Sequence, residues 1–177
     1  MTLASKIISY NNQLNIAISL PNNIQFLHPF KNNKEMNVII KKFYRKYYND
    51  TKPRFLILGI NPGRLGGGAT GIPFTDFKRL KEMCKFSFQN VTSAEPSSTF
   101  IYELISAYGG IKKFYSHFYI SSICPLGLIK VNSNGRKINY NYYDSKELAL
   151  SLSDFIAENL KKQIGFGLSR KVCFCFG

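Results

Sequence analysis

The chain has 177 residues, of which 45% are hydrophobic and 15% aromatic. This composition excludes a disordered chain, and the length suits a single domain, residues 1–177, with a substantial core. The 24 lysines and arginines outnumber the 10 acidic residues, which gives a formal charge of +14. Such an excess attracts polyanions, most often nucleic acid, although lysine-rich solvated faces explain it about equally well.

Sequence marks of export and of metal binding are absent. Polar residues interrupt segment 1–20, so it has no apolar stretch of signal-peptide length, and no other segment is long enough to span a bilayer. The 4 cysteines lack the pairing of a metal site, and Cys173 and Cys175 alternate in an apolar run as buried strand residues do. We expect an intracellular, reduced, monomeric protein without metal or cofactor.

Helical and extended segments alternate from the N-terminus onwards. Helices are predicted at residues 3–13 and 34–48, the second from apolar residues at helical spacing. Its opposite face carries basic residues, a pattern that is more often a solvated face than a nucleic-acid track. A first buried strand at 55–58 then leads into a glycine-rich loop that ends at Phe74.

A helix and a strand follow this loop. Ser97 and Ser98 are expected to cap a helix that ends before Gly109. The next strand, at 118–123, stops at a Cys-Pro pair. A tyrosine- and asparagine-rich loop comes next.

The last part of the chain is predicted to hold this tyrosine- and asparagine-rich loop, a helix and a strand. The loop has Gly135 at its tip, and Asp144 with Glu147 forms a capping-box-like start for a helix to about residue 163. A final strand is predicted at 172–176.

Three successive strand–helix units imply a parallel sheet with right-handed crossovers and helices on both faces. We therefore predict the α/β class, as three α/β/α layers around a small central parallel sheet. The chain ends at Gly177, directly after a predicted buried strand, where a turn and a covering helix would be usual. We therefore expect a C-terminally truncated domain.

The most informative motif lies in the glycine-rich loop. Gly-Ile-Asn-Pro-Gly at 59–63 follows the first strand directly, and Thr-Gly-Ile-Pro-Phe follows at 70–74. Open α/β sheets bind ligands beyond the carboxyl ends of their strands, so a ligand site is expected here. The loop offers one carboxamide, Asn61, no ionisable residue before Arg64, and an aromatic residue behind a proline. These features suit a flat, neutral, polar ring better than a phosphate.

Other interpretations of the glycines are weaker. Gly66, Gly68 and Gly71 satisfy the dinucleotide fingerprint G-x-G-x-x-G, but that fingerprint should open a helix directly after the strand. A phosphate-binding Walker A loop would need Gly-Lys-Ser/Thr, which is missing. A tight turn packed by glycines explains three glycines but neither the asparagine motif nor Phe74, which we interpret as a stacking platform.

These two motifs resemble the first motif of the uracil-DNA glycosylase superfamily. The match is to the branches with asparagine in that motif, the single-strand-selective monofunctional enzymes and the mismatch-specific enzymes. Segment 117–126, which ends in Cys-Pro-Leu, resembles the second strand of the single-strand-selective branch. The resemblance runs from residue 54 to 177 and implies a DNA repair hydrolase. Such an enzyme cleaves the N-glycosidic bond of uracil or a related damaged base flipped from single-stranded or duplex DNA.

The resemblance also implies residue roles. Asn61 matches the position that holds the attacking water, and Phe74 matches the aromatic residue that stacks on the flipped base. An amide positions water without being a strong base, so the rate must come from orientation and electrostatics. No lysine stands at the place of a Schiff-base nucleophile, so a monofunctional glycosylase is expected. The other implied substrate-binding residues are Gly59, Ile60, Pro62, Gly63, Gly68, Gly71 and Ser122.

Two departures from the family pattern leave alternatives open. The family's uracil-reading asparagine aligns with Ser122, whose hydroxyl cannot match the bidentate edge of uracil, so the base preference is open. The family's second motif, with its His-Pro pair, is missing from the end of the chain. His28 and His117 are interpreted as structural. The alternatives are a DNA- or base-binding module without excision activity and an enzyme that binds free nucleotides.

Four basic residues are the predicted contacts to DNA phosphates. We expect them on loops after strand ends, which surround the ligand site in such sheets. The four residues are Arg64, Lys130, Arg136 and Lys137.

Overall fold

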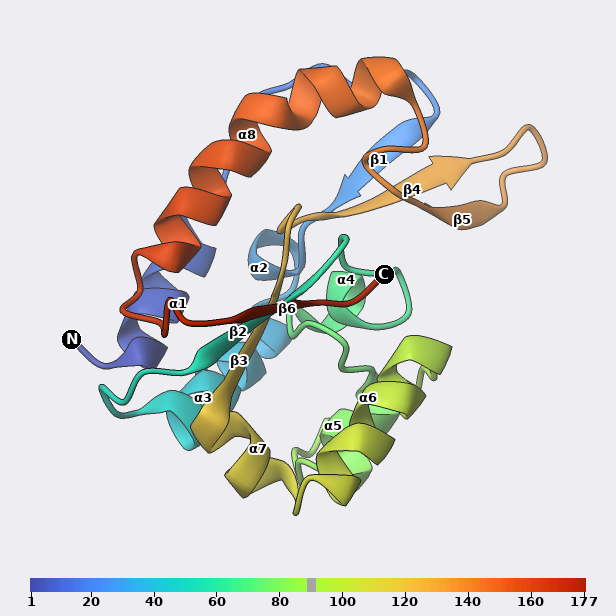
Figure 1. Ribbon diagram of the computed structural model, residues 1–177. Coiled ribbons are helices and arrows are strands. Elements are labelled where there is room, and N and C mark those ends of the chain that lie inside the picture. Colours follow the sequence, from blue (N-terminus) through green and yellow to red (C-terminus); the bar gives the residue numbers. More distant parts are fainter. Residues whose placement is uncertain (89–91) are drawn as a thin grey trace.

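The computed structural model describes residues 1–88 and 92–177, which form two small sheets with helices around them (Figure 1). The first sheet is parallel and has the order β3-β2-β6. Its central strand is β2 (Phe55–Gly59), with β3 (Phe118–Ser122) on one side and β6 (Cys173–Cys175) on the other. The predicted α/β class and its small parallel sheet are confirmed.

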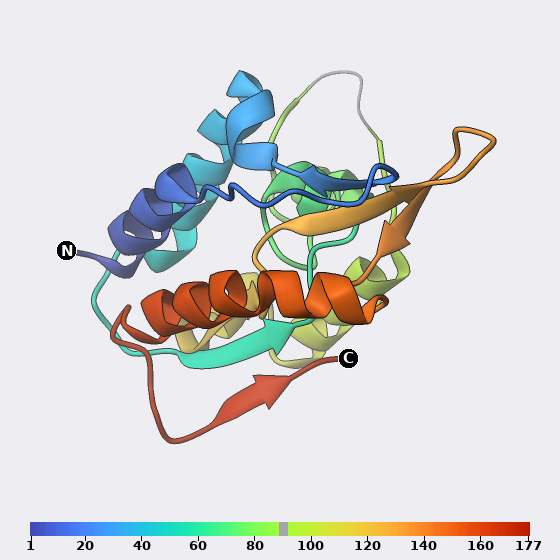
Figure 2. The same cartoon turned by 90° about the horizontal axis from the view of Figure 1, so that it is seen from above.

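All four predicted helices are present. The bounds of α1 (Leu3–Gln13) and α3 (Lys34–Tyr48) are those predicted, and α6 (Pro96–Ala107) and α8 (Lys146–Ile164) differ only near their ends. Shorter helices that the sequence analysis did not predict are α2 (Pro29–Asn32), α4 (Gly67–Thr70), α5 (Phe77–Glu82) and α7 (Ile111–His117). Helix α8 lies along one side of the parallel sheet, and α5, α6 and α7 lie on the other (Figures 1 and 2). No described helix is both long and apolar enough to cross a membrane.

Two helix caps differ from the prediction. Helix α6 begins at Pro96, and its N-cap residue is Glu95, whose side chain makes no capping hydrogen bond. Ser98, predicted as part of the cap, lies inside the first turn and is buried. Helix α8 is capped by Ser145, whose Oγ accepts from the Leu148 N–H at 3.3 Å, in place of the neighbouring Asp144. Proline suits the first helical position because it has no N–H to leave unpaired there.

The structure corrects the prediction of a loop after β3. A second, antiparallel sheet has the order β1-β4-β5, with β1 (Ile24–Leu27), β4 (Gly127–Val131) and β5 (Lys137–Tyr140). Strands β4 and β5 form a hairpin that projects from the body of the molecule (Figures 1 and 2). Its turn contains Asn134 and Gly135, an Asn-Gly pair typical of hairpins, and Gly135 has a φ of 77°.

Buried aromatic side chains hold β2 and its neighbours in place. The ring of Phe43 on α3 packs edge-on against Tyr115 on α7, with 5.4 Å between ring centroids. Arg54, directly before β2, is only 1% exposed and is paired with the Asp50 carboxylate. Its Nε also donates to the carbonyl of Tyr115 at 3.2 Å. These contacts anchor the start of β2, so its carboxyl end has a defined position.

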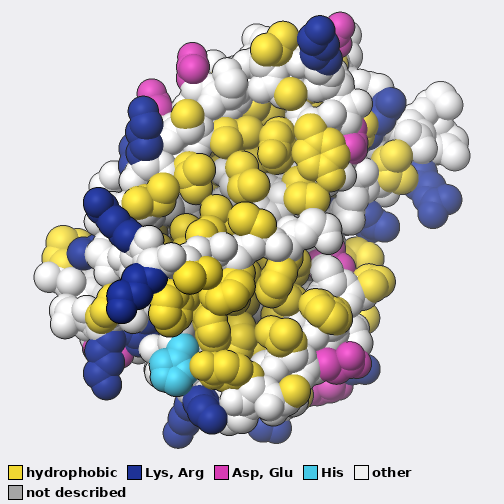
Figure 3. Space-filling model, in the orientation of Figure 1, with side chains coloured by type: hydrophobic (Ala, Val, Ile, Leu, Met, Phe, Trp, Pro, Cys, Tyr) yellow, Lys and Arg dark blue, Asp and Glu magenta, His cyan; other side chains and the backbone are white. Residues whose placement is uncertain are grey.

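Cys173 and Cys175 are exposed, which shows that their predicted burial was wrong. Among the described residues, β6 is an edge strand that pairs only with β2. Alternation of apolar residues does not distinguish an edge strand from a central one. Apolar side chains cross the middle of this face of the molecule, with Lys and Arg side chains mostly around its margin (Figure 3). Phe174 is 41% exposed here.

Candidate active site

A groove of about 670 Å³ opens beyond the carboxyl end of β2. Asn61 and Phe74, the predicted catalytic amide and the predicted stacking platform, both line it. The other lining residues come from the glycine-rich loop, from α6, from the end of β5 and from the end of β6. They include Ile60, Gly63, Glu95, Pro96, Ser97, Phe100, Asn139, Asn141 and Phe176.

Phe74 is held against the backbone of the loop. It is half-buried, and its φ of 52° is unusual for a residue with a side chain. A Cβ on Gly59 would lie only 2.6 Å from the Phe74 Cζ, so the ring occupies the space that a side chain at Gly59 would need. The ring of Phe176 packs edge-on against it, with 6.3 Å between centroids. One face of the groove is therefore an aromatic ring with a fixed position.

The carboxamide of Asn61 is hydrogen-bonded at both of its polar atoms. Its Nδ2 donates to the carbonyl of Tyr140 at 3.2 Å. Its Oδ1 accepts from the backbone N–H of Tyr142 at 3.3 Å. Both partners belong to the segment at and just after the end of β5, which the sequence analysis had assigned to a loop. The hairpin is thus part of the site.

The loop after Asn61 is folded onto itself. The backbone N–H groups of Gly66 and Gly68 both donate to the carbonyl of Gly63, at 3.2 Å and 2.8 Å. The backbone N–H of Arg64 donates to Asn139 Oδ1 at 2.9 Å, which joins the loop to β5 a second time. The resulting short turn leads into α4 and brings the chain back to Phe74.

Glu95 is a site residue that the sequence analysis missed. Its side chain covers two glycines of the loop, because Cβ atoms on Gly63 and Gly66 would lie 1.9 Å and 1.8 Å from its carboxylate oxygens. Glu95 is 9% exposed, and it has the only acidic side chain among the described residues that line the groove. Burial raises its pKa above the ordinary value; Asp76 also raises it, and Ser97 and Arg64 oppose the shift. No motif contains Glu95, so only three-dimensional proximity identifies it.

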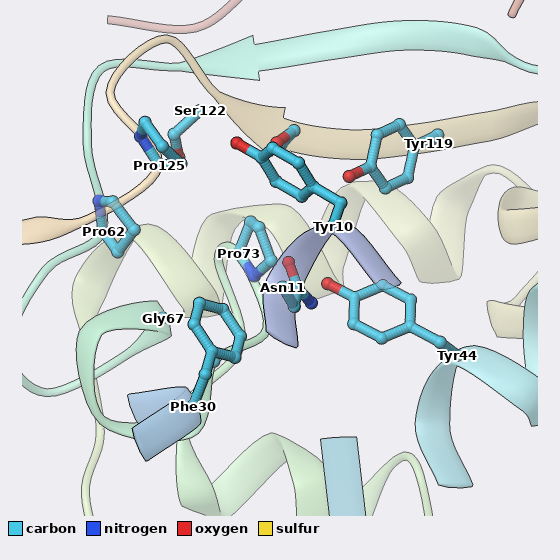
Figure 4. A pocket seen from close by; sticks show the side chains of 12 residues that line it. Tyr10, Asn11, Phe30, Tyr44, Pro62, Gly67, Pro73, Tyr119, Ser122 and Pro125 are labelled. Atoms are coloured by element: carbon cyan, nitrogen blue, oxygen red, sulfur yellow. The ribbon is translucent and has the colours of Figure 1, made fainter. Parts of the chain in front are cut away.

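Several other predicted substrate-binding residues are not among the described residues that line the groove. Pro62, Gly71 and Ser122 line a second, much smaller cavity of about 20 Å³ in the described structure (Figure 4). Ser122 is 4% exposed and lies in register with Gly59 on the neighbouring strand. Gly68 is also packed, since a Cβ there would lie 2.8 Å from the Gly63 carbonyl oxygen. These positions suit residues that determine the shape of the loop.

The small cavity is polar on one side. Tyr10 and Asn11 of α1, Tyr44 of α3 and Tyr119 of β3 line it (Figure 4). Within the described part of the chain, the Tyr10 hydroxyl and the Asn11 Nδ2 have no hydrogen-bond partner. Burial raises the pKa of the Tyr10 hydroxyl far above its ordinary value. The cavity has the size and polarity for about one bound water molecule.

None of the four predicted phosphate contacts is among the described residues that line the groove. Lys130 is in β4 and Lys137 begins β5, which corrects the expectation that they lie in loops. Arg136 is exposed in the turn between these strands, and Lys130 Nζ lies 5.6 Å from the centroid of the Tyr140 ring. The hairpin that contacts Asn61 therefore also carries three of the four cations.

The two histidines take part in contacts within the fold. His28 Nε2 lies 3.0 Å from the Leu14 carbonyl oxygen, and His117 Nδ1 lies 2.8 Å from the Tyr108 hydroxyl. Over residues 1–88 and 92–177, no group of three or more His, Cys, Asp or Glu side chains is arranged to hold a metal ion.

Comparison with known proteins assigns the fold and its loop to a family. A sequence profile of the Uracil DNA glycosylase superfamily matches residues 45–177, well over half of the chain. The chain therefore belongs to this superfamily. The crystal structure of wild-type SMUG2 from Pedobacter heparinus is similar to it, with a TM-score of 0.96 and 50% sequence identity over 100% of this chain and 76% of that chain. A search of curated protein sequences finds no match.

Proposed function

We propose that the chain is a monofunctional DNA glycosylase that removes uracil or a related damaged base. The observation that carries the proposal is the presence of Asn61 and Phe74 in one groove beyond the carboxyl end of β2. Membership of the superfamily supports DNA as the substrate. The groove is large enough for a flipped nucleotide and has both a flat apolar surface and a fixed amide.

The proposed reaction is a hydrolysis. The target nucleotide rotates out of the DNA stack, and its base lies against the Phe74 ring. Asn61 holds a water molecule at C1′ of the sugar. The water oxygen bonds to C1′ while the bond between C1′ and the base nitrogen breaks. The electron pair leaves with the base, and the proton lost by the water passes to the departing base or to solvent.

A neutral amide has little basicity, so the rate must come from the geometry of the site. Holding water and sugar in a productive arrangement can supply a large part of the barrier reduction. The Asn61 amide meets this requirement because both of its polar atoms have backbone partners. No covalent enzyme–sugar adduct is needed, and the product is an intact abasic strand.

The DNA backbone is proposed to lie across the hairpin and the start of the glycine-rich loop. Arg64 is at the loop, and Lys130, Arg136 and Lys137 are on the hairpin. Such contacts fix the position of DNA without reading its sequence. They also place the strand next to the segment that holds Asn61.

The test is single-turnover excision from labelled oligonucleotides that carry one uracil, either single-stranded or opposite guanine. Asn61→Ala removes the amide, and Asn49→Ala, at an exposed asparagine outside the groove, is the matched control. We expect abasic product with the wild type and Asn49→Ala and a loss of at least about 100-fold with Asn61→Ala. Saturable DNA binding without product from any protein would instead favour a binding module that lacks excision activity.

A further inference from the structure

The Asn61 carboxamide lies between two peptide groups that face it with opposite polarity. The carbonyl of Tyr140 accepts from Nδ2 at 3.2 Å, and the N–H of Tyr142 donates to Oδ1 at 3.3 Å. Turning the amide over would place oxygen against oxygen and N–H against N–H. Two hydrogen bonds would be replaced by two repulsive contacts. The orientation of the amide is therefore fixed by the backbone.

We propose that the peptide groups of Tyr140 and Tyr142 position the Asn61 amide for the reaction and select asparagine over aspartate at this position. This inference rests on the proposed function wherever excision is the readout. With one N–H and one lone pair occupied, Asn61 keeps one Nδ2–H and one Oδ1 lone pair for water. Each remaining group points in a single direction, which is what orientation-based catalysis requires.

Aspartate has the shape of asparagine but cannot make the same pair of contacts. An ionised carboxylate has no donor for the Tyr140 carbonyl, so one of its oxygens would face the carbonyl oxygen at close range. The side chain would have to rotate away or bind a proton. A carboxylate would be the stronger base, yet here it would lose the position that the amide holds.

Residues 139–142, which contact Asn61 and Arg64, also connect the parallel sheet to the antiparallel sheet. Asn61 follows β2 of the parallel sheet, whereas Tyr140 ends β5 of the antiparallel sheet. The Arg64 N–H donates to Asn139 Oδ1 at 2.9 Å, which is a third hydrogen bond between the glycine-rich loop and this segment. The hairpin that carries three of the four proposed phosphate contacts, together with the residues just after it, therefore sets the position of the catalytic amide.

The test compares Tyr142→Pro with Tyr142→Ala. Both variants lose the tyrosine ring, but only proline loses the N–H that donates to Asn61. Tyr142 is the second residue of a turn closed by the bond from the Asp144 N–H to the Asn141 carbonyl at 3.1 Å. Proline is favoured at this position of common turns, so the turn should persist. Thermal unfolding of both variants checks that they are folded.

We expect single-turnover excision by Tyr142→Pro to be about tenfold slower than by Tyr142→Ala, the effect of one lost hydrogen bond to the reacting amide. The Kd for uracil-containing DNA should be equal in the two variants. Equal excision rates would overturn the inference while leaving the proposed function intact. If Tyr142→Pro does not fold, Asn61→Asp is the variant that tests the inference. We expect its excision rate to be as low as that of Asn61→Ala. Excision by Asn61→Asp at the wild-type rate would overturn the inference.

A second readout does not depend on activity. The side-chain amide of Asn61 gives two N–H signals in a ¹⁵N-correlated NMR spectrum, identified by their disappearance in Asn61→Asp. In Tyr142→Ala we expect the signal of the Nδ2–H bonded to Tyr140 to be shifted downfield and protected from exchange with water. In Tyr142→Pro this protection should fall several-fold. Unprotected Asn61 signals in the wild type would contradict the proposed positioning, even for a protein without excision activity.

Discussion

The ring of Phe74 lies so close to Gly59 that a Cβ on Gly59 would be 2.6 Å from its Cζ and 2.7 Å from its Cε2. Gly59→Ala should therefore push the ring away from its place in the groove. Stacking of a base on an aromatic side chain is worth about 1–3 kcal/mol, so we expect excision to slow by about tenfold or more. Single-turnover rates at saturating protein measure the effect.

A double-mutant cycle separates this cause from a general effect on β2. Phe74→Leu removes the aromatic ring and with it most of the atoms that an alanine at Gly59 would meet. Because the two residues are in contact, their effects should not add. Gly59→Ala should cost much less in the Phe74→Leu background than in the wild type. Fully additive losses in excision rate would show that Gly59→Ala does not act by displacing the Phe74 ring.

The hairpin cations are expected to contribute to DNA affinity and not to the chemical step. Arg136→Ala and Lys137→Ala should each weaken binding at low salt. Each should also lower the slope of log affinity against log salt concentration by about one. The excision rate at saturating DNA should stay within about twofold. A slope that stays at the wild-type value would exclude these two residues as phosphate contacts.

The pair formed by Asp50 and Arg54 predicts a loss of stability in acid. The Arg54 guanidinium holds the pKa of Asp50 down to about 2, from an ordinary value of 3.8. A lowered pKa stabilises the folded state above the ordinary value, and this contribution is lost as the pH falls from about 4 to about 2. Asp50→Asn, which leaves Arg54 without its carboxylate, should cost about 1–3 kcal/mol at pH 7 in urea unfolding. The difference in unfolding free energy between Asp50→Asn and the wild type should disappear as the pH falls from about 4 to about 2.

Glu95 predicts the opposite dependence. Burial raises its pKa, so the folded state favours the protonated form. The associated stability is fully present below the ordinary pKa of 4.5 and is lost as the pH rises through the folded value. Glu95→Gln, which keeps the shape without the charge, should therefore unfold at a higher temperature than the wild type at pH 7. The difference should vanish near pH 4; a variant less stable at pH 7 would contradict the argument.

Thiol reactivity tests the position of β6 at the edge of the sheet. Cys84 and Cys124 are fully buried, and burial raises the pKa of the Cys124 thiol to about 12. Cys173 and Cys175 are exposed. Brief treatment of the native protein with a maleimide should therefore modify the last two and spare the first two, as read by mass spectrometry of peptides. Rapid labelling of Cys124 would show that the fold opens around it.

The elements that the sequence predicted well are those with strong local signals. Helix α3 has apolar residues at helical spacing over its whole length, and β2 is a short apolar run between polar neighbours. The second sheet was missed because strand β1 has little pattern of its own and pairs with β4 far along the chain. The Asn-Gly pair at the hairpin turn was the one available signal.

The grouping of residues in the groove was predictable where those residues are close in sequence. Asn61 and Phe74 belong to one loop, so one motif identified both. Glu95 and Asn139 approach that loop from α6 and β5, and their positions depend on long-range packing that no single-sequence pattern specifies. Ser122 could be placed at the end of its strand, but strand register alone did not tell that its side chain is buried.

The shape of the glycine-rich loop depends on the absence of a side chain at Gly127, on a strand far away in the sequence. A Cβ on Gly127, at the start of β4, would lie 2.4 Å from the carbonyl oxygen of Pro62. Any attempt to transplant the loop into another scaffold would therefore have to include a gap of the same shape opposite Pro62. The β4–β5 hairpin and the residues just after it would have to accompany the loop, because they supply both the space opposite Pro62 and the backbone partners of Asn61.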